Sequence, residues 1–164
     1  MNTKKITTLL GVLAIGTTSL YAAQCCGGVE KKSVEKYAKN EAKSKAVSDA
    51  TMASYVKLSS ALYKDDLKAA KKAAKLISSK EGASSLGKYA AKLAKSSDIK
   101  AARSSFTKIS ELLVPAAKGS KIYKKAHCPM ANGGKGGYWL QSATDKTVNN
   151  PYYGAAMAHC GSFK

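Results

Sequence analysis

The sequence predicts a mainly α-helical protein: a small bundle of about four helices, closed by a loop-rich C-terminal capping segment. From about residue 29 to residue 118 the chain is rich in alanine, lysine and serine and has no proline before Pro115, a composition typical of helices. Apolar residues recur in this part at helical spacing. Beyond it, glycine and aromatic residues accumulate and charge becomes sparse, which indicates turns and loops.

Residues 1–23 have the pattern of a secretory signal peptide. Lys4 and Lys5 precede an uncharged apolar stretch that is short for a membrane span, and small residues follow it. We therefore expect an exported, periplasmic protein. A lipoprotein acylated at Cys25 is an alternative, although Gln24 stands where such signals have a small residue, and an uncleaved N-terminal anchor is another.

About 140 residues remain after cleavage, enough for one domain with a modest core. We expect a polar lead-in over residues 24–48 and the helical bundle with its C-terminal segment over residues 49–164. Four apolar stripes at steps of three and four predict the helices. They are Tyr55, Leu58 and Leu62; Leu67, Ala70, Ala74 and Ile77; Tyr89 and Leu93; and Ile99, Ala102, Phe106, Ile109 and Leu113.

The ends of these helices are also marked. Asp65 or Asp66 is expected to cap the second helix and Asp98 the fourth, while Gly82 and Gly87 are expected to interrupt the chain around the third. Alanine dominates the inner faces and buries little area, so at about 25 cal/mol per Å² the bundle should be only marginally stable by itself. We expect another part of the chain to close it.

Lysine and arginine number 28 against 10 acidic residues, a formal net charge of +18. Nearly all are lysine, which lacks the planar fork that reads nucleic acid, so we expect no specific nucleic-acid partner. A weak attraction to anionic envelope surfaces is expected instead. Arg103, the single arginine, is expected to pair with Asp66 or Glu111 and order the bundle.

Both histidines of the chain stand directly before a cysteine, and a methionine lies close to each pair. Thiolate, imidazole and thioether groups together suit soft metals such as Cu(I). We therefore predict a metal site for Cu(I) or a similar soft cation. Its expected ligands are Cys128, Met130, Met157 and Cys160, with His127 and His159 completing or tuning the shell.

Other readings of the cysteines stay open. An oxidising compartment favours a Cys128–Cys160 disulfide, which would add roughly 3 to 4 kcal/mol of stability. Cys25 and Cys26 are weaker metal candidates, with a vicinal or intermolecular disulfide as the alternative. Trp139 is expected to anchor the core, or else to lie over a bound cation.

We expect no enzyme. The two histidines are already assigned to the cysteine motifs, which leaves no nucleophile, base and acid set for hydrolysis. A thiol redox enzyme would be expected to carry the Cys-x-x-Cys spacing, which the chain lacks.

A series of short motifs resembles a bacterial domain family of unknown function. They are Tyr55-x-x-Leu58-x-x-Ala61-Leu62, Ala101-x-Arg103-x-x-Phe106, Cys128-Pro129-Met130-Ala131, Tyr138-Trp139-Leu140, Asn150-Pro151-Tyr152-Tyr153-Gly154, Met157 and Cys160-Gly161. Members of that family are exported, and the domain also occurs attached to periplasmic adaptor subunits of copper and heavy-metal efflux pumps. The resemblance covers roughly residues 50–162. It implies a small helical bundle with a C-terminal cap, an association with metal handling, and matched positions at Cys128, Met130, Met157 and Cys160.

The combined expectation is an exported protein that binds Cu(I), or a similar soft cation, for metal resistance or delivery to an efflux system. The alternative is a disulfide-stapled helical envelope protein that acts as an interaction module without metal.

Overall fold

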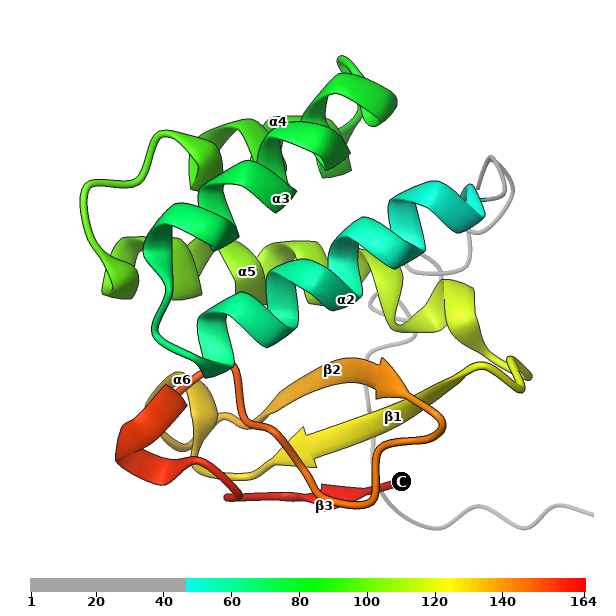
Figure 1. Ribbon diagram of the computed structural model, residues 1–164, viewed down its shortest axis with the longest axis vertical. Helices are drawn as coiled ribbons and strands as arrows, with labels where there is room; N and C mark the ends of the chain where they lie inside the picture. Colours follow the sequence, from blue (N-terminus) through cyan, green and yellow to red (C-terminus); the bar gives the residue numbers. More distant parts are fainter. Residues whose placement is uncertain (1–46) are drawn as a thin grey trace, which may run out of the picture. The chain divides into compact units, whose positions relative to one another are not determined.

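The computed structural model of the protein describes residues 47–164, and this part is mainly helical, as predicted. Figure 1 shows three layers: α3 and α4 form the outermost layer, α2 and α5 the middle layer, and a small sheet the third. The expected signal peptide, residues 1–23, and nearly all of the expected lead-in lie outside the described residues. Within residues 47–164, no helix has the length and apolar content needed to cross a bilayer.

Each of the four long helices begins at a serine or aspartate that caps it. The cap oxygen accepts the N–H of the residue three positions later and satisfies one of the unpaired donors of the first turn. The predicted caps at Asp66 and Asp98 are confirmed. The helices are α2 (Asp49–Tyr63, capped by Ser48), α3 (Leu67–Glu81, capped by Asp66), α4 (Ser85–Ala94, capped by Ser84) and α5 (Ile99–Leu113, capped by Asp98).

The two glycines of the helical part have different roles. Gly82 ends α3 with a φ of 54°, in the left-handed region that favours glycine. The expected interruption at Gly87 is wrong, because Gly87 lies inside α4 and is buried. A Cβ atom at Gly87 would lie 2.1 Å from the Gly82 carbonyl oxygen. The absence of a side chain therefore lets the start of α4 pack closely on the end of α3.

The predicted apolar stripes form the core. Tyr55 of α2 and Phe106 of α5 are fully buried and stack with their ring centroids 5.5 Å apart. The Tyr55 hydroxyl forms a 2.7 Å hydrogen bond with the Ser110 hydroxyl, which satisfies both groups inside the core. Alanine fills much of the remaining space. The fully buried alanines of the helices are Ala70, Ala74, Ala90 and Ala102.

The C-terminal segment, expected to be loop-rich, also contains a three-stranded antiparallel sheet of order β2-β1-β3. Ala126 in the central strand pairs with Trp139 on one side and with Phe163 on the other. The strands are β1 (Tyr123–Cys128), β2 (Gly137–Ser142) and β3 (Ser162–Phe163), and the short helical turns are η2 (Pro115–Ala117), α6 (Ala131–Gly134) and η3 (Gly154–Met157).

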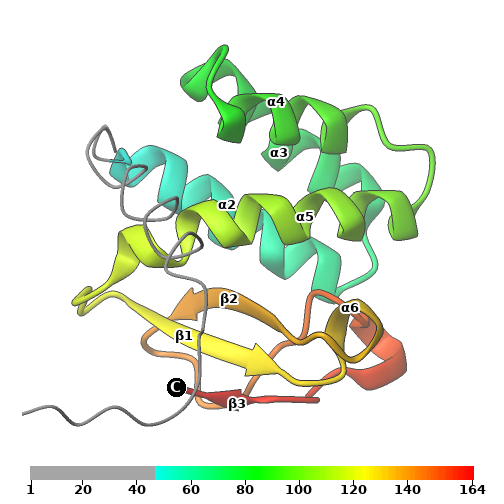
Figure 2. The ribbon, with the colours of Figure 1, turned by 180° about the vertical axis from the view of Figure 1, so that it is seen from behind.

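Strand β2 forms the edge of the sheet that faces the helices, next to α2 and α5 (Figures 1 and 2). The Leu140 N–H at this edge donates to the Tyr55 hydroxyl. Tyr152 continues the contact, because its ring packs edge-on against Phe106 at 5.5 Å and against Trp139 at 5.8 Å. These aromatic contacts join the helical core to the sheet.

Arg103 ties the helices to the C-terminal segment. It pairs with Asp65 at 2.5 Å, so the predicted pairing with Asp66 or Glu111 is wrong. Asp66 is instead the cap of α3, and Glu111 pairs with Lys108 on the surface of α5. Arg103 also donates from Nε to the carbonyl oxygen of Pro151 at 2.9 Å and from a terminal nitrogen to the carbonyl oxygen of Leu62 at 3.0 Å.

Substitution of Gly154 should test this junction. Gly154 has a φ of 57°, and a Cβ atom there would lie 2.4 Å from both Arg103 and Asp65. Gly154→Ala should therefore lower the free energy of unfolding by about 3 kcal/mol or more, through backbone strain and overpacking together. Gly119→Ala is the matched control, because Gly119 has a φ of 80° with open space around it and should cost only about 1 to 2 kcal/mol. Equal losses in urea unfolding would contradict a packed junction.

Acid should weaken the same junction. The Ala155 N–H, which donates to Asp65 at 2.9 Å, and the Arg103 guanidinium hold the pKa of this carboxyl below its usual range. In the unfolded chain the Asp65 carboxyl has the ordinary pKa of about 3.9. The contribution of Asp65 to the free energy of unfolding is therefore complete above that pH, and it is lost as pH falls through the lower pKa of the folded state. In urea unfolding from about pH 3 to pH 7, the natural chain should have a higher free energy of unfolding than Asp65→Asn. This difference should shrink only at the acid end of the range. A constant difference would contradict the assignment.

Candidate metal centre

The fold brings Cys128 and Cys160 together. Cys128 is the last residue of β1, and Cys160 lies two residues before β3, which pairs with β1. Their sulfur atoms lie 3.1 Å apart, although the two residues are 32 positions apart in the chain. Both thiols are free. The two sulfur-containing motifs therefore meet at one place in the folded chain.

The 3.1 Å separation lies between two bonded arrangements. A disulfide holds its sulfurs about 2.05 Å apart. Metal–thiolate bonds of about 2.3 Å at a tetrahedral angle would hold them roughly 3.8 Å apart. The sulfurs would have to approach by about 1 Å to form a disulfide. They would have to separate by about 0.7 Å to bind one metal ion between them. Either chemistry needs only side-chain adjustment.

The two thiols differ in their surroundings. Cys128 is fully buried in the cluster that includes Trp139 and Tyr152, whereas Cys160 is half-buried. The hydrogen bond between the sulfurs raises the pKa of the Cys160 thiol above its ordinary value, and burial and the negative charge of a Cys128 thiolate act in the same direction. A metal that binds here must displace this shared proton. Cys160 is the side from which an ion can enter.

Asn150 holds the loop that carries Cys160. It is fully buried, and its side-chain amide donates to the Cys160 carbonyl oxygen at 2.8 Å. Its side-chain oxygen accepts the Tyr152 N–H at 2.8 Å, and its own N–H donates to the Ala158 carbonyl oxygen at 2.8 Å. Asn150 is a site residue that was not predicted individually from the sequence. Its place in the Asn-Pro-Tyr motif was the available signal.

One ring nitrogen of His159 forms a hydrogen bond with the backbone of Val148. Its Nδ1 lies 2.7 Å from the carbonyl oxygen of Val148. A carbonyl only accepts, so Nδ1 carries the proton and the neutral ring has its lone pair on Nε2. Metal-bound histidines often have this arrangement, with the second nitrogen donating to a backbone carbonyl. The residue is exposed, and its ring centroid lies 6.1 Å from that of Tyr63.

The structure does not bring His127 to the cysteine sulfurs. Successive residues of a strand point to opposite faces, so His127 and Cys128 lie on different faces of β1. The His127 ring packs on Tyr138, its cross-strand partner, with centroids 4.3 Å apart. This contact gives His127 a surface position on the sheet.

The two methionines differ in exposure. Met130 is 51 % exposed, and its carbonyl oxygen accepts the Tyr153 hydroxyl at 2.6 Å. Met157 is half-buried at the end of η3, and its carbonyl oxygen accepts the Cys160 N–H at 3.2 Å. This hydrogen bond closes a turn from Met157 to Cys160.

Trp139 is a core residue. It is fully buried, and its ring N–H donates to the Gln141 side-chain oxygen at 3.0 Å. The same oxygen accepts the Asn149 N–H at 2.8 Å. Gln141 therefore connects β2 to the loop that follows it, a role that no sequence motif indicated.

Cys25 and Cys26 lie outside the described residues. From residue 47 onward, no three His, Cys, Asp or Glu side chains gather into a set that could hold a metal ion. The described site is thus a pair of sulfurs.

Residues 51–125 match the model of a family described as a protein of unknown function, DUF3347. The matched range covers most of α2, all of α3 to α5, and the beginning of β1. The match supports the resemblance to a domain family of unknown function, and it ends before Cys128. No curated protein and no solved structure matches the chain significantly.

Mild oxidation should join Cys128 and Cys160 within one chain, because their sulfurs already lie 3.1 Å apart. The closed loop should raise the free energy of unfolding by about 3 to 4 kcal/mol. Non-reducing peptide mapping would identify the bond, and Cys160→Ser should remove both the bond and the gain. An oxidised protein that is less stable than the reduced one would show that this pair cannot close without strain.

Proposed function

We propose that the protein is an exported carrier of Cu(I), or of a similar soft cation, that serves metal resistance or delivery to an efflux system. The proposed ligands are the Cys128 and Cys160 thiolates. The observation that supports this proposal is the meeting of two unbonded sulfurs 3.1 Å apart from motifs distant in the chain.

The donor atoms favour a soft ion. Thiolates and thioethers select Cu(I) over hard cations, which prefer oxygen ligands. Met157 and His159 lie within three residues of Cys160 along the chain and carry further soft-metal donor groups. In the described structure, however, His159 does not join the two cysteines in a three-residue set. His127 is left out of the proposed shell because it lies on the opposite face of β1.

The supports of the two cysteines suit reversible binding. Cys128 is fixed in the central strand, whereas Cys160 lies in a loop tied through Asn150. One rigid ligand and one loop-borne ligand allow the sulfurs to separate by the fraction of an ångström that a bridging ion needs. Half-buried Cys160 gives the ion a route to and from a partner. A component of a metal efflux pump is the proposed receiver, on the basis of the family resemblance.

The second candidate function is a disulfide-stapled interaction module without metal. The same short distance between the sulfurs favours it, and so does an oxidising compartment. The two functions predict different behaviour of the reduced protein. The metal carrier should bind Cu(I) in that form, and the disulfide-stapled module should not.

A Cu(I) competition titration on the reduced protein tests the proposal. We expect one ion per chain in the described site and its loss in the Cys128→Ser, Cys160→Ser double variant. His127→Ala is the matched control and should retain the affinity within about threefold, less than the tenfold change that 1.4 kcal/mol would produce. If the double variant binds as tightly as the natural chain, the cysteine pair is not the site. If the reduced protein takes up no Cu(I), the staple alone is supported.

Binding should also depend on pH. Because the pKa of the Cys160 thiol is raised, this thiol is protonated at neutral pH, and the ion that binds it must displace the proton into the solvent. Affinity should therefore rise with pH, by up to about tenfold per unit for each proton displaced, and should continue to rise past the ordinary cysteine value of about 8.5. A pH-independent affinity between about pH 6 and pH 9 would contradict thiolate ligation.

A further inference from the structure

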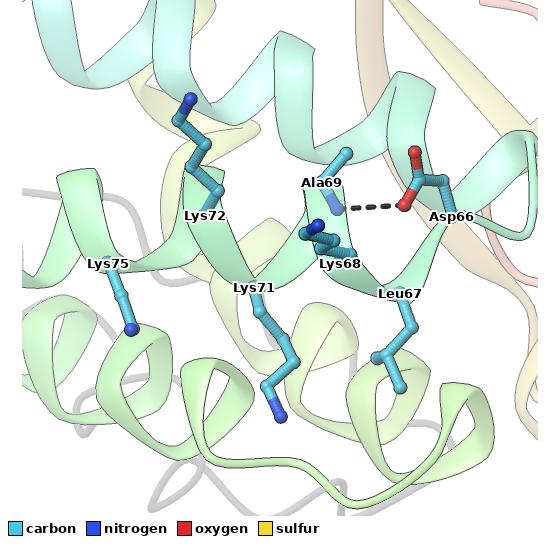
Figure 3. Close-up of a pocket in the computed structure, with 7 residues that line it drawn as sticks. All are labelled: Asp66, Leu67, Lys68, Ala69, Lys71, Lys72 and Lys75. Carbon is cyan, nitrogen blue, oxygen red and sulfur yellow. Dashed lines mark hydrogen bonds between the residues drawn. The ribbon is translucent and has the colours of Figure 1, made fainter.

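The surface of α3 carries an open groove of about 750 Å³. Figure 3 shows Lys71 and Lys75 projecting to one side of the helix together with Leu67, and Lys72 projecting to the opposite side. The groove is lined by Asp66, Leu67, Lys68, Ala69, Lys71, Lys72 and Lys75. Four lysines thus surround a short apolar floor. We refer to these seven residues and Leu76 as the α3 surface.

The positive charge of the α3 surface is not neutralised by the described part of the chain. Over residues 47–164 two ion pairs form, and both lie outside α3 and α4. Asp66 accepts the Ala69 N–H as the helix cap. Glu81, the one acidic residue of α3, accepts the buried Thr51 hydroxyl at 2.7 Å. Lys71 donates to the Ser96 carbonyl oxygen, and the exposed Lys68, Lys72 and Lys75 direct their charge to solvent.

Apolar groups lie among these lysines. Leu76, which directly follows Lys75, is 44 % exposed, and half-buried Leu67 lies on the groove floor. Lysine side chains add to this area, because their methylene stems cover apolar surface while the ammonium group reaches a polar phase. A basic surface with exposed leucine fits the boundary between lipid headgroups and acyl chains.

The type of cation also favours a bilayer. Lysine is a compact point charge without the fork by which arginine grips a single phosphate. The α3 surface contains no arginine. A spread of point charges matches the diffuse negative potential of an anionic leaflet, at about 1 kcal/mol for each basic residue near the surface.

We propose that the α3 surface docks the protein on membranes rich in anionic phospholipid. This inference does not depend on metal binding. The layer formed by α2 and α5 lies between α3 and the sheet that carries Cys128, so docking through α3 does not involve the sheet (Figures 1 and 2). The general attraction to envelope surfaces expected from net charge is thereby assigned to one helix.

Vesicle sedimentation tests the proposal with two triple variants of equal charge change. Lys68→Glu, Lys72→Glu and Lys75→Glu together reverse the α3 surface and spare Lys71, which donates to the Ser96 carbonyl oxygen. The matched control reverses three exposed lysines of the loops beside the sheet, Lys118, Lys121 and Lys146. Vesicles of phosphatidylglycerol and phosphatidylcholine in equal parts are compared with phosphatidylcholine alone, and circular dichroism confirms that each variant is folded.

We expect the natural chain to bind the anionic vesicles only. The affinity for these vesicles should fall by about tenfold or more in the α3 variant and by less than about threefold in the control. Leu76→Ser should weaken it by about threefold to tenfold with no change in charge. Added salt of about 0.5 M should release the protein, because it screens charges beyond a few ångströms. Equal losses in the two triple variants, or binding to soluble polyphosphate but not to vesicles, would overturn the proposal.

Discussion

The Arg103 guanidinium makes the contacts on which the arrangement of the two halves depends. It projects from α5 and bonds to the end of α2, through Leu62 and Asp65, and to the C-terminal segment at Pro151. Large buried side chains of the helices and of the C-terminal segment share one apolar core, in which Tyr152 contacts both Phe106 and Trp139. Arg103 adds the charged attachment point between the two parts.

This attachment explains how two distant cysteines come to lie side by side. The position of Cys128 follows from the register of the central strand, and that of Cys160 from the loop that Asn150 organises. Both supports belong to the segment that Arg103 and Tyr152 hold against the helices. A bond between the sulfurs, direct or through an ion, would link the two ends of that segment. Chemistry at the pair is therefore coupled to the stability of the whole C-terminal part.

The local features of the fold could be predicted from the sequence, and most of the non-local ones could not; the meeting of Cys128 and Cys160 is the exception. Apolar stripes and aspartate caps act within a few residues, so Asp66 and Asp98 were identified correctly. Strand β1 reads Tyr-Lys-Lys-Ala-His-Cys, without clear alternation, and it is a strand because β2 and β3 pair with it. Asp66 was predicted as a partner of Arg103, but the partner is its neighbour Asp65. Asp65 lies just beyond the end of α2 and has a left-handed backbone conformation, which the sequence did not indicate. The strand also separates His127 from Cys128, which composition alone could not show.

The α3 surface and the cysteine pair belong to different layers of the described structure, which separates the proposed docking surface from the proposed ligands. If α3 rests on an anionic leaflet, the layer formed by α2 and α5 separates it from the sheet (Figure 1). An ion held there is accessible to a soluble or membrane-anchored partner without competition from lipid. The lysines of α3 lie in a different layer from the sulfurs, so substitutions there can change surface attachment while Cys128 and Cys160 keep their surroundings.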